Sequence, residues 1–555
     1  MSNIAATIAS QLSVGYHCCI VPPAVPCTSA VSHLVQTNVD EVCACIRKLR
    51  NKSSPVDYIP TSLLKRLSHI LAPYIVNLVN MSFASGQFPS QLKLAHVTPV
   101  LKKAGLDDSE PCNYRPISNL STISKIMEKI YLARLKNVIF ASPNFPRHQS
   151  GFRPGHSTET ALLKVFDDLV GNAEKQYATL LLSLDISSAF DTIDHTILCS
   201  RIREDFGVDG TALKWLHSYL VERQMYVALA KAKSDPVCCK FGVPQGSVLG
   251  PILFSLYISP IGRLVESYGC SYHQYADDTQ LYLAVRPGQG YSSLQTCTAA
   301  VRSWFLMNNM LLNPSKTEAA VFGTQARRSA LLPIVSSVDV AGTSIQLSNS
   351  LKLLGVTFDG RLSFDDQITS VVKACNYHLA ALRHIRPVLS KDVASMIACS
   401  IVGTRLDYCN GLYYGMSASN FTRLQRVQDS LAKTVVAAPQ FVSASAARRS
   451  LHWLSIRQRV RYKLAVVSFK AYHTGAPNYL SVLLQDYCPT RRLRSSSSLL
   501  LSVPRVSLQM TTRGFAHAAP STWNFLDLSV RSIPTLPAFK RHLKTYLMSA
   551  DHSST

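Results

Sequence analysis

The chain has 555 residues, of which 47% are hydrophobic and 16% are charged, and this composition is typical of folded domains rather than of a disordered tail. The 57 Lys and Arg residues outnumber the 33 Asp and Glu residues and give a net charge of +24. Such a balance favours a polyanionic partner, either nucleic acid or an anionic membrane surface. The length leaves room for two to four domains.

The usual signals of secretion, membrane insertion and structural zinc are absent from the sequence. The first basic residue is Arg47, so the start has neither a secretory n-region nor an Arg-rich transit peptide. The apolar run 70–81 is interrupted by Pro73 and falls short of the roughly 20 residues that cross a bilayer. None of the fifteen cysteines has C-x2-C spacing. We therefore expect an intracellular protein, nuclear or cytoplasmic, with reduced thiols and no membrane segment.

In the first part of the chain, local patterns predict two helices and a strand. Residues 1 to about 45 have no strong periodicity, but from residue 39 Val42, Ile46 and Leu49 recur on one helical face. A second helix-like apolar stretch covers residues 63–79. The run 94–101 is strand-like and leads into the basic pair Lys102-Lys103.

The middle of the chain alternates between helical and strand-like segments. A helical period extends over residues 157–174, with Ser157 or Thr158 as the candidate N-cap. The apolar run 180–185 predicts a buried strand that ends at Asp185. Residues 272–275 and 279–283 predict two short strands joined across Ala276-Asp277-Asp278. This alternation over residues 95–360 favours an α+β domain.

Beyond about residue 365 the pattern is mostly helical and the charge is strongly basic. From Lys433 to the end there are seventeen Lys and Arg residues but only three Asp and no Glu, so this tail carries +14 of the net +24. We expect a basic surface there, either for nucleic-acid phosphates or simply as a solvated helical face.

The Asp277-Asp278 pair is a candidate metal site because two neighbouring carboxylates in a hairpin turn repel each other unless a cation or a proton intervenes. Mg²⁺ prefers a few carboxylates together with water and phosphate oxygens. Asp185, at the end of another predicted strand, is the natural third ligand. Taken alone, an Asp-Asp pair in a loop is more often a solvated turn.

Three segments favour a metal site over a solvated turn, because they occur together and in the order found in one family of enzymes. Residues 184–191 (LDISSAFD), 242–254 (GVPQGSVLGPILF) and 275–278 (YADD) resemble motifs A, B and C of reverse transcriptases. Asp185 and Asp277 are 92 residues apart, which is a reasonable separation for motifs A and C. Further segments resemble the fingers motif of LINE-type enzymes, the block after it, motif D, motif E and the family's C-terminal region: residues 113–118, 149–155, 312–318, 353–356, 452–454, 477–480 and 519–524.

The resemblance covers roughly residues 50 to 550 and points to the LINE-type, non-LTR branch, in its jockey-like or vertebrate-type part. It implies an RNA-directed DNA polymerase that adds deoxynucleotides to a DNA 3′ end, so RNA template, DNA primer or target and deoxynucleoside triphosphates are the expected partners. The implied fold is a right-hand polymerase with fingers, an antiparallel palm sheet and a helical thumb. The expected division is a lead-in with a helical extension, fingers and palm, thumb, and a basic nucleic-acid-binding region, at residues 1–94, 95–360, 361–440 and 441–555.

The resemblance also implies roles for individual residues. Asp185 and Asp277 would be the principal ligands of two Mg²⁺ ions, for which Mn²⁺ could substitute, with Asp278 in support and the Ile186 carbonyl completing one shell. Phe190 occupies the position of the steric gate against ribonucleotides, and its bland alternative is core packing. The remaining predicted substrate contacts are Gln245 and Gly246 to the template or incoming base, Lys102, Lys103 and Arg115 to the triphosphate, and Lys316 as a proton donor to pyrophosphate.

Basic residues of the C-terminal tail alternate with aromatic residues, a combination that suits phosphate contacts and base stacking. The plain alternative for Gln245 and Gly246 is an ordinary strand-to-helix turn, and for the single lysines a solvated position. The tail residues concerned are Arg448, Arg449, Arg457, Arg459, Arg461, Arg491, Arg492 and Arg494, with Trp453, Tyr462 and Tyr479.

Two other functions compete with this interpretation. An RNA-dependent RNA polymerase shares the chemistry, but typically has Gly-Asp-Asp where this chain has Ala276-Asp277-Asp278, and Phe190 favours DNA synthesis. The second is a non-catalytic retrotransposon relic that only binds nucleic acid. We see neither an upstream endonuclease domain nor a C-terminal zinc knuckle, so the sequence looks like a truncated copy or a partial gene model.

Overall fold

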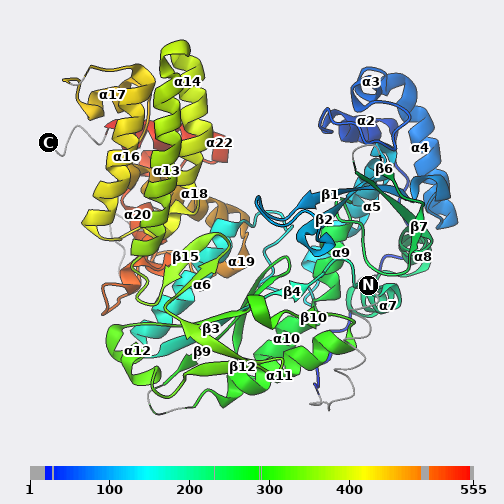
Figure 1. The fold of residues 1–555 in the computed structure, drawn as a ribbon, viewed down its shortest axis with the longest axis horizontal. Helices are drawn as coiled ribbons and strands as arrows, with labels where there is room; N and C mark the ends of the chain where they lie inside the picture. Colours follow the sequence, from blue (N-terminus) through cyan, green and yellow to red (C-terminus); the bar gives the residue numbers. More distant parts are fainter. Residues whose placement is uncertain are drawn as a thin grey trace. The chain divides into compact units, whose positions relative to one another are not determined.

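The computed structural model describes residues 19–27, 30–229, 232–286, 288, 290–439, 441–488 and 499–549, so Arg491, Arg492 and Arg494 lie outside the described residues. The chain forms two units, each assembled from several segments, and Figure 1 labels their helices and strands. Unit 1 contains residues 1–152, 185–268 and 296–313, and unit 2 contains residues 153–184, 269–295 and 314–555. Each unit is described by itself.

The helices of unit 1 confirm the periodic segments of the sequence and refine their ends. The predicted helix from residue 39 is α2 and ends at Arg47, before Leu49, while the stretch 63–79 is divided between α3 and α4 at Leu67. The described helices of unit 1 are α2 (Val39–Arg47), α3 (Thr61–Arg66), α4 (Ser68–Ser85), α5 (Thr122–Ala141), α7 (His195–Phe206), α8 (Gly210–Leu220), α9 (Gly250–Tyr257), α10 (Pro260–Ser267) and most of α11 (Ser292–Met307).

The main sheet of unit 1 has the order β2-β1-β5-β6, with β7 also paired to β5. Its strands are β1 (Leu94–Leu101), β2 (Tyr114–Asn119), β5 (Arg223–Leu229), β6 (Ala232–Lys233) and β7 (Val237–Cys239). Strand β1 confirms the predicted strand, and it lies antiparallel to β2 but parallel to β5. A separate antiparallel pair joins β4 (Ile186–Ser187) to β10 (Leu311–Leu312).

Aromatic side chains hold helices α4, α5 and α8 together in unit 1. Trp215 is fully buried and stacks on Tyr131 of α5, with ring centroids 4.2 Å apart. Phe83 of α4 meets Trp215 edge to face at 5.7 Å, and Tyr219 stacks on it at 5.8 Å. Large rings with several such contacts contribute more than their buried area alone, so this cluster anchors α5, which the functional site uses.

Unit 2 contains a six-stranded sheet with the order β12-β13-β11-β3-β9-β8, antiparallel except between β11 and β13. Its strands are β3 (Ala178–Leu184), β8 (Ser271–Tyr275), β9 (Asp278–Val285), β11 (Glu318–Phe322), β12 (Ser337–Val340) and β13 (Thr343–Ser348). Helix α6 (Thr158–Glu174) packs on β3 and β8 and begins with a capping box at Ser157. These elements confirm the predicted helix, strands and α+β class.

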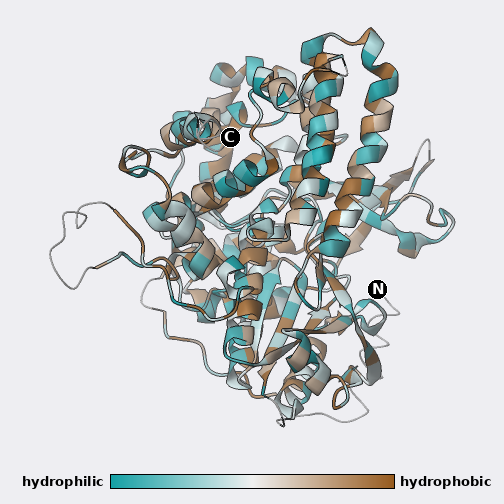
Figure 2. Cartoon of the chain, turned by 90° about the vertical axis from the view of Figure 1, so that its left-hand side faces the viewer, coloured by the Kyte–Doolittle hydropathy of each residue, from teal (hydrophilic) through white to brown (hydrophobic). Residues whose placement is uncertain are grey.

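One hydrophobic core continues from α6 and this sheet through the helical remainder of unit 2. Several long helices have brown apolar and teal polar faces in Figure 2, as expected for helices that bury one side. The remaining elements are β14 (Ser350–Leu353), β15 (Val356–Asp359), α12 (Gln325–Leu331), α13 (Asp365–Ile385), α14 (Lys391–Ile397), α15 (Thr404–Asp407), α16 (Ala418–Val436), α17 (Ala444–Ser450), α18 (Ile456–Thr474), α19 (Asn478–Ser481), α20 (Phe515–Asn524), α21 (Leu528–Arg531) and α22 (Leu536–Ser549).

The core includes residues on both sides of residue 440. Val435 of α16 and Leu464 of α18 are both buried in it, as is Leu543 of α22. The tail is therefore packed against the helices that precede it, and the four-part division of the chain stays a prediction. Among the described helices, none is both long and apolar enough to cross a membrane.

Candidate functional site

The two adjacent aspartates lie at the β8–β9 hairpin of unit 2. Tyr275 pairs with Asp278, so the loop between the strands consists of Ala276 and Asp277. Ala276 takes a φ of 59°, since two-residue hairpin turns between twisted strands need the left-handed region. Asp277 is half-buried in the turn and Asp278, the first residue of β9, is exposed. The predicted hairpin with carboxylates at its end is thus present.

Asp185 follows directly after β3 and opens a segment of unit 1. It is half-buried, and its backbone carbonyl accepts a hydrogen bond from Asn313 N at 2.9 Å. The next residue, Ile186, pairs with Leu312 in the β4–β10 ladder. The residues resembling motif A are therefore joined to the start of those resembling motif D, while Asp277 and Asp278 belong to unit 2.

Phe190 is half-buried, with its ring stacked on Phe254 of α9 at a centroid distance of 5.0 Å. Its carbonyl accepts a hydrogen bond from Val243 N at 2.8 Å. The loop resembling motif B is therefore attached to the segment resembling motif A through the backbone of Phe190. Packing on Phe254 fixes one face of the ring and leaves part of the side chain accessible.

Two glycines allow the motif B loop to approach its neighbours closely. Gly242 has a φ of 84°, and a Cβ there would lie 2.9 Å from backbone atoms of Phe190 and Asp191. Gly246 has a φ of 120°, and its Cβ would lie 2.6 Å from the carbonyl oxygen of Ser118 on β2. Both positions need the missing side chain and a left-handed backbone, so they are more constrained than an ordinary strand-to-helix turn.

Gln245 joins this loop to β2 and to the segment that follows Phe190. Its carbonyl accepts from Ser118 N at 2.7 Å, and its Nε2 lies 3.1 Å from each carboxylate oxygen of Asp191. Burial raises the pKa of Asp191, and the hydrogen bonds from Gln245 partly offset that rise. A hollow of about 240 Å³ is lined by these groups together with Pro116 and Phe241.

Sequence reasoning missed Glu128 of α5, which is fully buried and binds the end of the same loop. Its Oε2 accepts hydrogen bonds from Val248 N at 2.7 Å and Leu249 N at 3.1 Å, at the start of α9, and its Oε1 accepts from Ser124 Oγ at 3.2 Å. Burial raises the pKa of Glu128, against the opposing effect of these bonds. The available signal was a glutamate among apolar residues at helical spacing, Ile126, Met127, Ile130 and Tyr131.

The predicted phosphate contacts are divided between the units. Lys102, Lys103 and Arg115 are exposed at the loop end of the β1–β2 hairpin in unit 1, where Lys102 Nζ donates to the Cys112 carbonyl at 2.7 Å. Lys316 is exposed in a short turn of unit 2. The structure thus brings the first three together on one hairpin, and Lys316 comes from another segment.

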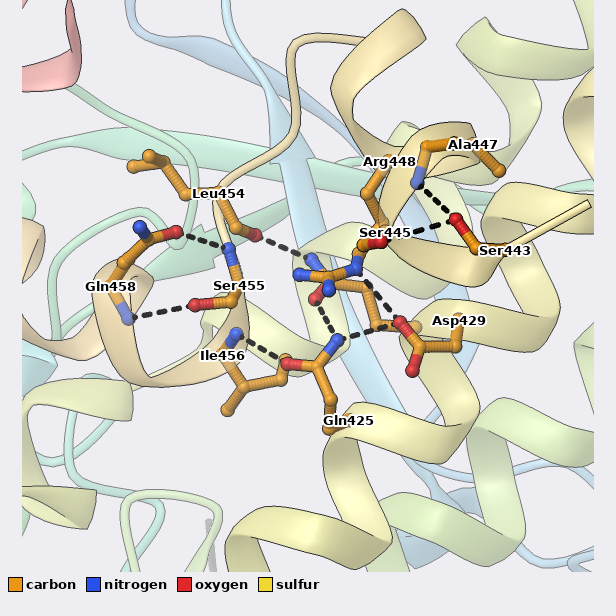
Figure 3. Close-up of polar contacts among 12 residues, drawn as sticks. Gln425, Asp429, Ser443, Ser445, Ala447, Arg448, Leu454, Ser455, Ile456 and Gln458 are labelled. Carbon is orange, nitrogen blue, oxygen red and sulfur yellow. Dashed lines mark hydrogen bonds and ion pairs between the residues drawn. The ribbon is translucent and has the colours of Figure 1, made fainter. Parts of the chain in front are cut away.

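Several basic side chains of the tail are engaged in the structure of unit 2. Arg459 Nη1 bonds Asp407 Oδ2 at 2.6 Å, and Arg448 Nε lies 2.8 Å from Asp429 Oδ1. Figure 3 shows the second pair within a polar junction of α16, α17 and the start of α18, where Gln425 Nε2 also donates to Asp429 at 2.7 Å. Arg448 and Arg459 therefore have structural partners already.

The aromatic residues of the tail also pack into the fold. Tyr479 is buried, and its hydroxyl donates to Thr160 Oγ1 on α6 at 3.1 Å. Trp453 and Tyr462 are half-buried against the core. Arg449 is exposed, as are Arg457 and Arg461, which lie over the rings of Phe421 at 4.2 Å and Phe525 at 4.8 Å. These three arginines are the described tail cations that remain open to solvent among those singled out in the sequence.

Among the described residues there is no cluster of three or more His, Cys, Asp or Glu side chains placed to hold a metal ion. The described cysteines form no disulfide.

Comparison with known proteins identifies the family. A family model described as reverse transcriptase (RNA-dependent DNA polymerase) matches residues 100–358. Three Drosophila melanogaster proteins are similar to the chain: a probable RNA-directed DNA polymerase from transposon BS is 27% identical over 82% of this chain and 50% of that protein, one from transposon X-element is 30% identical over 73% and 44%, and the RNA-directed DNA polymerase from mobile element jockey is 28% identical over 75% and 46%.

The chain spans about half the length of these curated relatives. Among solved structures, a telomerase from Candida tropicalis truncated from its C-terminal domain superposes with a TM-score of 0.35 at 14% identity, over 56% of this chain and 60% of that chain. The assignment accordingly rests on the family model and the sequence relatives: the chain belongs to the reverse transcriptases of non-LTR retrotransposons, beside those of the BS, X-element and jockey elements.

Proposed function

We propose that this chain is an RNA-directed DNA polymerase that adds deoxynucleotides to a DNA 3′ end on an RNA template, inside the cell, in the nucleus or cytoplasm. The observation that carries the proposal is the register of β3 against β9. Leu184 pairs with Thr279 at one end of the ladder. At that end Asp185 directly follows Leu184 in the chain, and Asp278 directly precedes Thr279. Asp277 occupies the adjoining turn, so each of the three aspartates is within two residues of this pair along the chain.

The donor set fits Mg²⁺, because aspartate and carbonyl oxygens are the hard ligands that this ion prefers. Asp185 and Asp277 would be the principal ligands and Asp278 the supporting one. The bond from Asn313 N to the Asp185 carbonyl makes Asp185 and Asn313 a hydrogen-bonded pair of the ladder. Hydrogen-bonded and non-hydrogen-bonded pairs alternate in an antiparallel ladder, so Ile186 and Leu312 form a non-hydrogen-bonded pair and the Ile186 carbonyl points away from β10. Two divalent ions, when bound, would stabilise negative charge on the attacking and leaving oxygens.

Side chains around this site would bind and select the substrates. Phe190, held by Phe254, would exclude a 2′-hydroxyl from beneath the incoming sugar. Gly246 and Gln245 would allow template and incoming base to approach the backbone closely. Lys102, Lys103 and Arg115 would neutralise the triphosphate, and Lys316 would donate a proton to pyrophosphate.

The same proposal assigns a right-hand arrangement to the chain. The sheet of unit 2 that bears Asp277 would be the palm, and the β1–β2 hairpin would belong to the fingers. The helices after residue 360 would form the thumb, followed by the basic C-terminal region from residue 441. RNA template and DNA primer would be the macromolecular partners.

A primer-extension assay with purified chain tests the proposal, with RNA and DNA templates in parallel and Mg²⁺ or Mn²⁺ as the cation. We expect Asp277→Ala to reduce extension by several orders of magnitude while template binding survives, because charge stabilisation supplies much of the lowering of the barrier. Asp339→Ala is the matched control, since Asp339 is an exposed aspartate beside another hairpin turn of the same sheet.

Appreciable extension by the Asp277→Ala variant would disprove the mechanism. A parent chain that binds RNA but extends no primer with either cation would instead favour the non-catalytic relic.

A further inference from the structure

A basic hollow of about 250 Å³ lies in unit 1, away from the residues assigned above. It is bounded by the segment between α2 and α3, the end of β2 and the first turns of α5. Its lining includes three cations, Arg50, Lys52 and Lys125, together with hydroxyl groups of Ser53 and Thr122. No acidic residue is among the lining residues.

The three cations of this basic hollow lack a hydrogen-bond acceptor or ion-pair partner within the described part of the chain. Arg50 and Lys52 are exposed, whereas Lys125 is half-buried and burial lowers its pKa. Two carboxylates act on Lys125 from a distance, Asp57 and Glu128, and both are already occupied. Concentrated positive charge without an internal acceptor is unfavourable unless an anion from outside neutralises it.

The Asp57 carboxylate accepts hydrogen bonds from residues that border the hollow and forms no ion pair with its described cations. Its carboxylate accepts from Thr122 N and Thr122 Oγ1, each at 2.6 Å, and from Ser54 N at 2.9 Å. It therefore ties the segment between α2 and α3 to the first turn of α5. Glu128 is likewise committed to the backbone at the start of α9.

Further hydrogen bonds hold the hollow in one shape. Thr61 N donates to Ser53 Oγ at 3.0 Å, and Thr61 Oγ1 donates to the Lys52 carbonyl at 3.2 Å. The hydroxyl of Thr61 is also 3.3 Å from that of Thr122. A preformed site loses little conformational freedom when a ligand binds, so the bonds that fix this loop favour binding.

The end of β2 connects the basic hollow to the motif B loop. Asn119 lines the hollow, and its neighbour Ser118 donates its backbone N–H to Gln245. Successive residues of a strand are about 3.3 Å apart and point to opposite faces. The hollow and the motif B loop therefore adjoin neighbouring residues at the same end of β2.

We propose that the basic hollow binds a backbone phosphate of the single-stranded RNA template, through Arg50, Lys52 and Lys125. The proposal deepens the polymerase function and rests on it for the identity of the ligand. Guanidinium and ammonium groups supply charge-assisted hydrogen bonds to phosphate oxygens, and the Ser53 hydroxyl, which accepts from Thr61 N, still has its proton to donate. The contact is independent of base identity, as a template contact of a polymerase must be.

The test measures binding of a fluorescent single-stranded RNA to the Arg50→Gln/Lys52→Gln variant as a function of salt, without added metal and so without catalysis. Both residues are exposed, so their replacement leaves the packing of unit 1 intact. We expect weaker binding and a slope of log affinity against log salt that is smaller by about 0.7, because the contact with the one phosphate in the hollow is lost.

The matched control is Arg47→Gln/Lys48→Gln, which removes one exposed Arg and one exposed Lys from the neighbouring turn outside the hollow. Its salt slope should stay near that of the parent. A set of templates, each with one neutral methylphosphonate linkage, locates the contact. At one position the neutral linkage should weaken RNA binding by the parent chain but leave RNA binding by the Arg50→Gln/Lys52→Gln variant unchanged.

Equal slopes for the two double variants would overturn the proposal, as would a template series with no such position. A variant with parental RNA affinity but a raised KM for deoxynucleoside triphosphates would assign the hollow to the incoming nucleotide and would also overturn it. Primer extension by the parent chain is scored separately, so a failed phosphate site and a failed polymerase assignment give different results.

Discussion

Replacing Glu128 tests how unit 1 holds the loop that carries Gln245 and Gly246. In Glu128→Ala, the N–H groups of Val248 and Leu249 lose their acceptor in a buried environment. A buried donor without a partner costs about 1–3 kcal/mol, so the two together destabilise unit 1 by about 2–6 kcal/mol. The loop that leads into α9 is then free to shift, and we expect a raised KM for deoxynucleotides as well as a lower melting temperature.

Glu128→Gln separates the charge of this side chain from its hydrogen bonds. The amide oxygen can accept from both backbone N–H groups, and Ser124 can accept from the amide nitrogen where it now donates. Burial outweighs the hydrogen bonds in setting the pKa of Glu128. Replacing the carboxyl group with a neutral amide therefore loses little hydrogen-bond energy. We expect Glu128→Gln to have a stability within about 1 kcal/mol of the parent and a nearly unchanged KM for deoxynucleotides.

The raised pKa of Glu128 also predicts a pH dependence. The folded state binds the proton of the Glu128 carboxyl group more tightly than the unfolded state does. The resulting contribution to the free energy of unfolding is fully present below the unfolded pKa and is lost as pH rises through the raised folded pKa. Glu128→Gln lacks this contribution. The stability of the parent relative to this variant should therefore be greatest in acid and decline as pH rises.

Chemical denaturation and steady-state primer extension measure these effects. Asp167→Ala in unit 2 is the matched control, because Asp167 is a half-buried carboxylate that accepts from Ala516 N at 2.8 Å near the start of α20. It should lower stability without a specific change in the KM for deoxynucleotides. Parental stability and KM in Glu128→Ala, or equal KM changes in both alanine variants, would refute the positioning role.

Three further variants test other parts of the structure. Phe190→Val should raise ribonucleotide incorporation relative to deoxyribonucleotide in a primer-extension assay, and an unchanged ratio in an active variant would assign Phe190 to core packing. Ala276→Gly should keep activity and raise the melting temperature slightly, because relief of about 1–2 kcal/mol of left-handed strain exceeds the entropic cost of glycine, about 0.5–1 kcal/mol; a lower melting temperature would contradict this. Arg457→Gln/Arg461→Gln should weaken RNA binding and reduce its salt slope by about 1.4. Arg459 is left intact in this variant because it binds Asp407. A parental salt slope would identify this helix as a solvated face.

Features that depend on residues close together in the chain were predictable from the sequence. The N-cap at Ser157, the buried strand that leads to Asp185 and the hairpin around Ala276 all follow from local hydrophobic period and turn chemistry. The sequence motifs also indicated the family, which the relatives confirm. The roles of the individual site residues stay predictions.

Interactions between distant segments were decided only by the tertiary structure. The partners of Glu128 lie 120 and 121 residues further along the chain, and Arg459 finds Asp407 across 52 residues. Periodicity shows which face of a helix is buried, but not which backbone N–H groups or carboxylates will meet that face. Those pairings depend on how the helices pack, because a buried polar group must find its partner wherever the completed fold provides one.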